Sequence, residues 1–331
     1  MKPGEGQRQR SGIIARESAD AAGREGIVAR PHAARAGLLR RLLEHEQVLA
    51  GLLLLPTIVI LSLFIAYPFA KGIWLSVSSA TVGNPGVFIG TKNFVKTWND
   101  SIFQKAAQNT VVYTAIATVF KLGLGMILAL LLNHHFRGKR LVRASVLLPF
   151  IIPTVLSTFA WKWMFDPTFS VINWALYRFG IITQRIPWLS NADLALGSVI
   201  IVNVWRGMPF FAITLLAGLQ TVNPELHEAA AIDGASGWQR FWRITWPLLL
   251  PVTMVVVLFS IIQTFADFQL VYVLTGGGPA NSTHLFATYA YQIGVATGLL
   301  GEGAAISLAM FPILFVIVIF QLWYIRRVEG A

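Results

Sequence analysis

The sequence predicts an all-α integral membrane protein with six transmembrane helices. Hydrophobic residues make up 55% of its 331 positions, 22 Phe and 11 Trp among them, whereas charged residues make up only 12%. A soluble protein of this size has no interior large enough to bury so much apolar surface. Several apolar runs also exceed the roughly 18 residues that a helix needs to cross about 30 Å of hydrocarbon. Together these observations predict a chain that crosses a membrane repeatedly.

The net charge of +11 is distributed as the topology of a membrane protein requires, which argues against a nucleic-acid partner. Most Lys and Arg residues lie in residues 1–45, in the loop after residue 133, in the loop at 223–247 and in residues 326–331. Because cytoplasmic loops carry the excess of basic residues, this distribution predicts that both termini are cytoplasmic. Membrane lipid should surround the apolar spans between the loops. The absence of cysteine excludes disulfides and cysteine-ligated metals.

The chain is predicted to have four regions. Residues 1–45 are rich in Arg, Ala and Gly without a sustained apolar period, so they should form a basic, mostly disordered cytoplasmic tail. Residues 46–108 should hold the first transmembrane helix and an outer loop that ends in a surface helix. Residues 109–325 should form the transmembrane core, and residues 326–331 a cytoplasmic C-terminus.

The six predicted spans follow apolar runs that polar or turn-forming residues interrupt. The first has about 22 residues, which as a helix measure about 33 Å, and Tyr67, Pro68 and Trp74 suit its outer interface. The basic loop from Arg137 to Arg143 marks the cytoplasmic end of the second span. The spans are placed at residues 48–69, 109–133, 144–165, 194–218, 248–274 and 303–324.

The loop at 223–247 carries clear local signals. Asn223 is a suitable N-cap and Pro224 suits the first helical position, so a short helix should begin here. It should stop at Gly234, because glycine readily adopts the left-handed conformation that ends many helices. Ser236 can then cap a second, amphipathic helix, whose apolar face would carry Trp238, Phe241 and Trp242. The thin, alanine-rich first helix suits docking in a groove of another protein, although an ordinary amphipathic re-entry segment would show the same pattern.

Residues 228–235, E-A-A-A-I-D-G-A, are followed by F-W-R-I at 241–244 and resemble the EAA signature of ABC-importer permease subunits. The segment T-G-G-G-P at 275–279 resembles the turn after the fifth span in the carbohydrate-importing branch. The resemblance covers roughly residues 45–325 and implies the type I ABC importer permease architecture in the bacterial cytoplasmic (inner) membrane. In that family the EAA segment is a coupling helix that docks on a separate ATPase. Carried over by position, the contact and turn residues would be Glu228, Ala229, Ala230, Asp233 and Gly234.

The same resemblance implies a second homologous permease chain, two ATP-binding subunits that use ATP and Mg, and an extracytoplasmic solute-binding protein. The sequence contains no G-x-x-x-x-G-K-[ST] loop and no hydrolase motif. We therefore expect no catalytic residue, no bound cofactor and no metal site in this chain, whose adjacent His134 and His135 lack further ligands.

The expected function is that of a permease subunit, not an enzyme, for a sugar or a related polyol. One alternative is a permease of the same family for glycerol phosphate or another solute. The other, from a different class, is a self-contained channel or secondary transporter, which would not need the loop at 223–247.

Polar residues inside predicted spans mark a candidate translocation path, because they are costly in lipid and usually face a watery route. Arg206 lies near mid-depth, about 18 Å from the start of its span, and Pro209 predicts unwound backbone beside it. Arg206 and Asp267 could instead pair and hold two spans together. Lys121 and Lys162 should snorkel or form interhelical bonds. The predicted path residues are Asn203, Trp205, Arg206, Gln263 and Asp267.

Overall fold

The computed structural model describes residues 46–329, so the predicted basic tail lies outside the described residues. The described residues divide into two units, of which the first ends at Pro68 and the second begins at Phe69. Within residues 46–329 the regular structure is helical, apart from two isolated β-bridges in the loop after the first long helix. Five of the described helices are long and apolar enough to cross a membrane, and one bent pair brings the number to six. This confirms the predicted all-α membrane fold.

The first unit contributes helix α3 (Glu46–Leu61) and the π-helical turn η1 (Ser62–Ala66), after which the helix continues as α4 (Tyr67–Ser76). The predicted first span is therefore correct in place but too short. Pro68 does not end the helix, because the π-helical turn before it takes up the change in hydrogen-bond register. The side chains of residues 47–71 are exposed, as expected for a helix surrounded by lipid.

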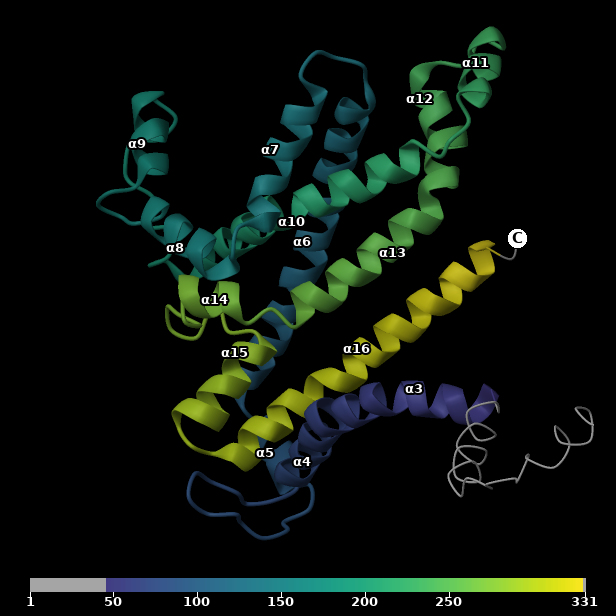
Figure 1. The fold of residues 1–331 in the computed structure, drawn as a ribbon. Helices are drawn as coiled ribbons and strands as arrows, with labels where there is room; N and C mark the ends of the chain where they lie inside the picture. Colours follow the sequence, from purple (N-terminus) through teal and green to yellow (C-terminus); the bar gives the residue numbers. More distant parts are fainter. Residues whose placement is uncertain (1–45, 330–331) are drawn as a thin grey trace, which may run out of the picture. The chain divides into compact units, whose positions relative to one another are not determined.

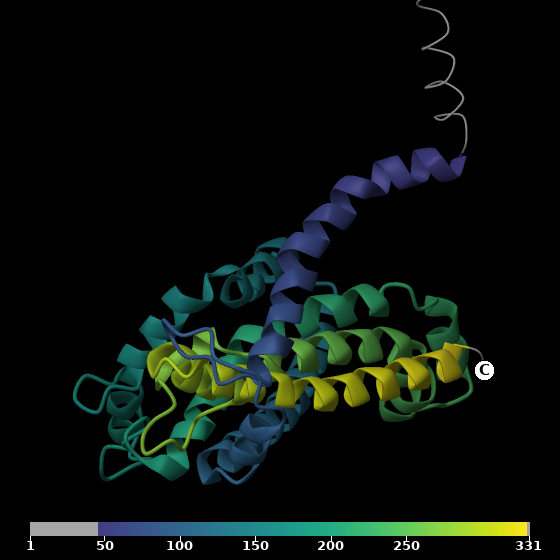
Figure 2. The same ribbon diagram turned by 90° about the horizontal axis from the view of Figure 1, so that it is seen from below.

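In the second unit, four long helices form a bundle (Figures 1 and 2): α6 (Ser101–Asn133), α10 (Ala192–Leu219), α13 (Trp246–Phe265) and α16 (Leu300–Glu329). Helix α10 packs on α6, and α13 packs on α6, α10 and α16. Glycines allow this close approach, since a Cβ at Gly125 would lie 2.5 Å from the Phe211 Cβ, and one at Gly218 would lie 2.8 Å from Leu249. Buried side chains from α6, α10 and α13 form one continuous core cluster.

The predicted third span is wrong as a straight helix. It consists of α7 (Lys139–Ile151) and α8 (Thr154–Met164), which meet at 90°. The cause is Pro153, because a residue that precedes proline is disfavoured in the helical conformation, and Ile152 is extended with ψ 132°. The apolar composition continues across this bend, so hydropathy alone did not reveal it.

The predicted fifth span is also interrupted. Helix α13 ends at Phe265, and a separate short helix, α14 (Gln269–Leu274), follows after a break of three residues. Asp267 therefore lies in this break rather than one turn further along a continuous helix. The predicted unwinding at Pro209 is wrong, because α10 remains helical through that residue.

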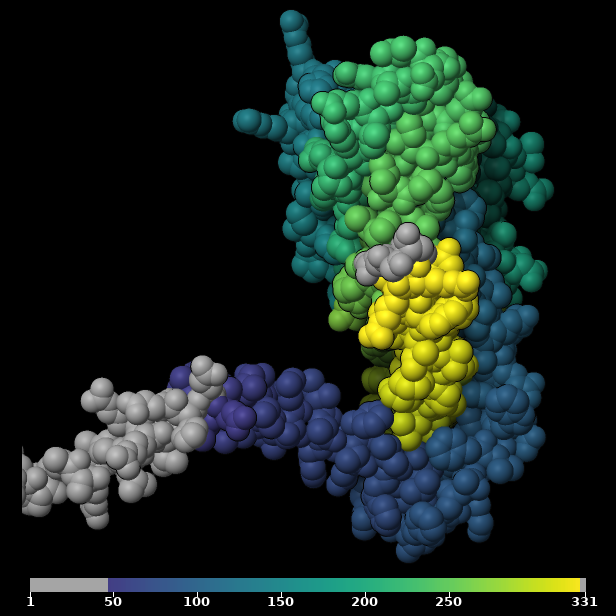
Figure 3. Space-filling view, turned by 90° about the vertical axis from the view of Figure 1, so that its right-hand side faces the viewer, coloured from purple at the N-terminus to yellow at the C-terminus, as the bar shows by residue number. Residues whose placement is uncertain are grey.

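The remaining helices are shorter and lie around the bundle. Figure 1 shows α11 at the end opposite to α5 and α15, and Figure 3 shows the green surface of α11 to α13 continuing beyond the yellow surface of α16. The bounds of these shorter elements are α5 (Lys92–Trp98), α9 (Val171–Arg178), α11 (Pro224–Ile232), α12 (Gly237–Arg240), η2 (Phe241–Thr245), α15 (Phe286–Tyr291) and η3 (Gln292–Ala296). Helix α5 confirms the surface helix that was predicted to end the outer loop.

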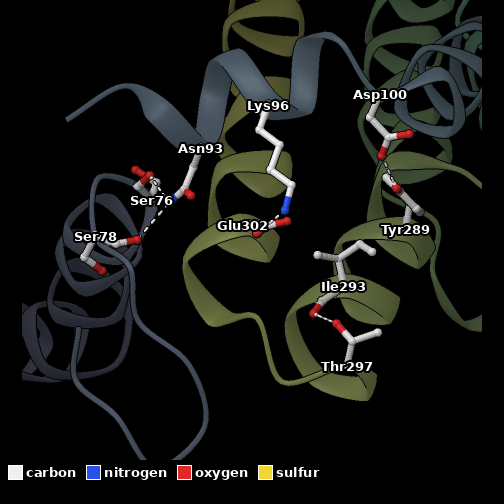
Figure 4. A network of polar contacts seen from close by, with 9 residues as sticks. All are labelled: Ser76, Ser78, Asn93, Lys96, Asp100, Tyr289, Ile293, Thr297 and Glu302. Carbon is white, nitrogen blue, oxygen red and sulfur yellow. Dashed lines mark hydrogen bonds and ion pairs between the residues drawn. The ribbon is translucent and has the colours of Figure 1, made fainter. Parts of the chain in front are cut away.

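A polar network fastens α5 to its neighbours (Figure 4). The Lys96 ammonium lies 2.6 Å from the Glu302 carboxylate at the start of α16. The Asn93 amide donates hydrogen bonds to the carbonyl oxygens of Ser76 and Ser78, at 2.9 and 2.8 Å. Asp100, which caps α6, accepts a hydrogen bond from the Tyr289 hydroxyl of α15. These bonds hold the elements at this end of the bundle together.

Candidate functional site

Helix α11 begins and ends where the sequence predicts. The Asn223 Oδ1 accepts a hydrogen bond from the backbone N–H of Glu225 at 3.0 Å, and Pro224 occupies the first helical position. Beyond the helix, Gly234 has a φ of +80°, which most side chains disfavour. This turn lets the N–H of Ala235 donate to the Ala230 carbonyl at 2.9 Å, which completes the C-cap.

None of the residues of α11 is buried. The Ile232 side chain at its end is 88% exposed, an unusual position for a large aliphatic group. Five residues were predicted to contact a partner or to form the turn after the helix. Ala230 is half-buried, and the exposed ones are Glu228, Ala229, Asp233 and Gly234. A capped, well-formed helix with no fully buried residue offers most of its surface to another molecule.

The second helix is joined to α11 and to the bundle. Ser236 and Gln239 form a capping box that starts α12, and the Arg240 guanidinium donates to the His227 carbonyl of α11 at 3.4 Å. The predicted apolar face is confirmed, because the rings of Trp238, Phe241 and Trp242 contact one another with centroids 5.1 to 6.3 Å apart. The helix then continues without a break through η2 into α13, so residues 237–265 form one rod. Its far end is the break that contains Asp267.

A cavity of about 430 Å³ lies between α6, α7, α8, α10, α13 and the start of α14. Four of the five predicted path residues line it: Asn203, Arg206, Gln263 and Asp267. Trp205 is not part of this lining, because its ring packs edge-on against Trp161 of α8, with centroids 5.4 Å apart. The structure thus brings four of the predicted residues together and assigns the fifth to the contact between α8 and α10.

Asp267 is held by three donors. Its carboxylate accepts hydrogen bonds from the Tyr113 hydroxyl at 2.7 Å, from the Asn203 amide at 3.2 Å and from the backbone N–H of Leu270 at 3.3 Å. It forms no ion pair with Arg206, since the pair between Lys96 and Glu302 is the one ion pair among residues 46–329. The alternative in which Arg206 and Asp267 pair to hold two helices together is therefore wrong.

Lys121 forms the predicted interhelical bond. Its side chain is 3% exposed, and its ammonium donates to the Thr264 hydroxyl at 2.7 Å, which ties α6 to α13 beside the cavity. The stem of Lys121 lies against Gly207, where an added Cβ would approach the Lys121 Cδ to 2.5 Å. The Lys162 ammonium likewise donates to the Val273 carbonyl at 3.3 Å and ties α8 to α14.

Sequence reasoning missed other lining residues. Ser260 and Thr264 line the cavity together with Gln263 and Asp267. Ser260, Gln263, Thr264 and Asp267 follow the pattern i, i+3, i+4, i+7 of one helix face, so the helical periodicity of polar residues in this apolar segment could have found them. Tyr113 carried no such signal, because its role depends on a partner that lies 154 residues away in the sequence.

Several polar atoms at the cavity are buried without a hydrogen-bond partner: the Asn203 Oδ1, the Arg206 Nε and the Ser260 Oγ. Buried polar groups in proteins are normally paired, so these atoms mark a place where another molecule can supply hydrogen bonds. They comprise acceptors and donors, as a solute rich in hydroxyl groups requires. Among residues 46–329, no three His, Asp or Glu side chains lie close enough to hold a metal ion.

Residues 121–330 match the family described as the binding-protein-dependent transport system inner membrane component. The sulfoquinovosyl glycerol transport system permease protein of Agrobacterium fabrum is 37% identical over 270 residues, which cover 81% of this chain and 87% of that protein. The trehalose/maltose transport system permease protein of Thermococcus litoralis is 33% identical over 88% of this chain and 98% of its own length.

The fold is also found in a solved transporter. One chain in the crystal structure of a bacterial ABC transporter that imports the acidic polysaccharide alginate superimposes with a TM-score of 0.76. Its sequence is 25% identical, and the match covers 87% of this chain and 98% of that chain. The fold of this chain therefore matches that of a chain in a solved ABC importer.

Proposed function

The chain belongs to the binding-protein-dependent transport system inner membrane components, and we propose that it moves a sugar or a related polyol across the cytoplasmic membrane. It is a multi-pass membrane protein and a permease subunit of an ABC importer. The sugar assignment is supported by the names of its relatives and by the unpaired donors and acceptors at the cavity. Family membership argues against a self-contained channel or secondary transporter.

The coupling role of α11 rests on one observation: this capped helix of nine residues buries none of its side chains. In our proposal Glu228, Ala229 and Ala230 contact a separate ATPase subunit, whereas Asp233 and Gly234 form the turn. ATP and Mg would be used by that subunit. Because residues 237–265 form one rod, closure of the ATPase subunits would move α13 directly and change the cavity at its far end.

The cavity is proposed as part of the translocation path, with Asn203, Arg206, Gln263 and Asp267 in contact with the passing solute. Trp205 would act indirectly, by keeping α8 against α10. We propose that the path lies between this chain and a second homologous permease chain, which would line its other side.

The proposed assembly also contains two ATP-binding subunits inside and a solute-binding protein outside. The basic loop between α6 and α7 lies at the same end of the bundle as α11 (Figure 1), which supports a cytoplasmic position for both loops. The distribution of Lys and Arg along the sequence supports the same side for the two termini.

Two glycines allow a matched test of the coupling role. Gly234 and Gly138 have φ values of +80° and +82°, and an added Cβ would meet no atom within 4 Å at either position. A valine, which strongly disfavours positive φ, should therefore strain both turns to a similar degree. We expect Gly234→Val to reduce the ATPase subunit retained by the purified permease severalfold, and Gly138→Val to leave most of it. Equal retention by the two variants would contradict the proposal.

A further inference from the structure

The charged side chains around the cavity differ in how many hydrogen bonds they make to the protein. Three charged residues line it: Lys121, Arg206 and Asp267. The Asp267 carboxylate already accepts three hydrogen bonds from the protein, and the Lys121 ammonium is committed to Thr264. Arg206 makes no ion pair with any described residue, and its buried Nε has no hydrogen-bond partner.

A guanidinium that makes no direct ion pair at the wall of an apolar bundle is costly, so it normally meets a carboxylate, a phosphate or a similar anion. Its planar donors suit such oxygen pairs well. The neighbouring free acceptors, the Asn203 Oδ1 and the Ser260 Oγ, suit hydroxyl groups instead. The lining thus combines one place for an anionic group with places for neutral hydroxyls.

We propose that the cavity takes a sugar that carries an anionic group, with Arg206 holding that group and with Asn203 and Ser260 bonding to its hydroxyls. This assignment rests on the proposed function as a sugar permease and narrows its substrate class to acidic sugars. The Asp267 carboxylate accepts hydrogen bonds from Tyr113, from Asn203 and from the backbone of Leu270, and none from Arg206, so the guanidinium keeps donors for the solute.

The lack of cysteine in the chain allows a direct test. Ala266 lines the cavity and is exposed, so Ala266→Cys introduces a single thiol there, whereas Val87→Cys introduces one on an outer loop, where the native side chain is 68% exposed. The full chain, purified with its co-expressed subunits in lipid nanodiscs, is labelled with anionic sulfonatoethyl or cationic trimethylammonioethyl methanethiosulfonate. The mass of this chain reports the labelling rate.

The ratio of the labelling rate with the anionic reagent to that with the cationic reagent is compared at the two positions. We expect this ratio to be about tenfold higher at residue 266 than at residue 87, because apolar walls focus the field of a charge. The preference should vanish in Arg206→Gln and persist in Arg206→Lys and in the distant control Arg178→Gln. The uncharged methyl methanethiosulfonate shows whether the cavity of each variant is intact. If Arg206→Gln changes the labelling rate of this uncharged reagent, the cavity of the variant is altered. The proposal is then tested by comparing two sugars on the Ala266→Cys chain with Arg206 in place.

Sodium glucuronate should slow the labelling of residue 266, and glucose at the same concentration should not. The proposal is overturned by equal reagent preference at the two positions, or by glucose slowing the reaction as much as glucuronate, or by neither sugar slowing it. Labelling requires no transport, so these outcomes would leave the permease function and its coupling to an ATPase untouched.

Discussion

Lys121 and Thr264 are joined by a hydrogen bond of 2.7 Å, although 143 residues separate them in the sequence. The bond links α6 to α13 beside the cavity, at the end of the rod that leads back to the loop at 223–247. A shift of α13 relative to α6 would therefore stretch or break a bond made by a buried ammonium. In the proposed mechanism, the stability of the bundle and the coupling of transport both depend on this contact.

Removing the acceptor should destabilise the protein. Thr264→Val leaves the Lys121 ammonium buried without a partner, which costs about 1 to 3 kcal/mol or more. Thr253 is the matched control, since it is equally buried on the same helix and its hydroxyl has no partner. Thr253→Val should be neutral or slightly stabilising. Apparent melting temperatures in detergent compare the two, and an equal loss in both would show that the bond to Lys121 contributes nothing.

A glycine beside Lys121 should be essential for the same reason. In Gly207→Ala the new Cβ would approach the Lys121 Cδ to 2.5 Å, so the buried side chain must move away from Thr264. Overpacking of this kind costs about 1 to 3 kcal/mol. In Gly197→Ala, on the same helix, the Cβ meets nothing within 4 Å, and the gain in helix propensity is up to about 1 kcal/mol. The melting temperature should fall for the first variant and hold or rise for the second. The reverse order would contradict the packing described.

The ends of helices were predicted best from the sequence, because residues close by in the chain determine them. The bounds of α11 and the start of α12 depend on Asn223, Gly234 and Ser236, each of which acts on backbone groups a few residues away. The breaks at Pro153 and at Asp267 were missed, because apolar runs lie on both sides of each break and hydropathy records composition only.

Contacts between distant helices were harder to predict. Trp205 was predicted to border the path, yet its ring packs against Trp161 on a helix whose bend was not foreseen. Conversely, Asn203, Arg206, Gln263 and Asp267 meet at one cavity because polar groups in a membrane bundle gather away from lipid. That rule identifies polar residues from the sequence, but it does not reveal partners such as Tyr113.

The loop between α14 and α15 allows a test of how closely its backbone packs against His284. Gly276 and Gly277 both have positive φ, so alanine strains either one. At Gly277, however, the Cβ would also lie 2.1 to 2.4 Å from the ring of the buried His284, whereas at Gly276 the nearest atom is 3.8 Å away. Gly277→Ala should therefore reduce the yield of folded protein far more than Gly276→Ala. Similar yields on size-exclusion chromatography would show that the ring moves freely.

His284 should make stability depend on pH. It lies in the connection between two candidate spans, and burial lowers the pKa of its imidazole below the ordinary value of 6.5. The unfolded chain then binds this proton at higher pH than the folded one, so stability is lost as pH falls below about 6.5. Between pH 7.5 and 5.5 the melting temperature should fall more steeply for the natural protein than for His284→Gln. Parallel curves would contradict this origin.

Helix α11 is proposed to dock on an ATPase subunit at the cytoplasmic side. Ala230→Cys, introduced into a chain without cysteine, provides the most direct measurement: cross-linking in the assembled transporter, combined with labelling by a membrane-impermeant thiol reagent on either side. We predict a cross-link from residue 230 to the ATP-binding subunit and labelling from the cytoplasmic side only, with Val87→Cys labelled from outside. Labelling of residue 230 from outside, or a cross-link to lipid alone while uptake continues, would contradict the account.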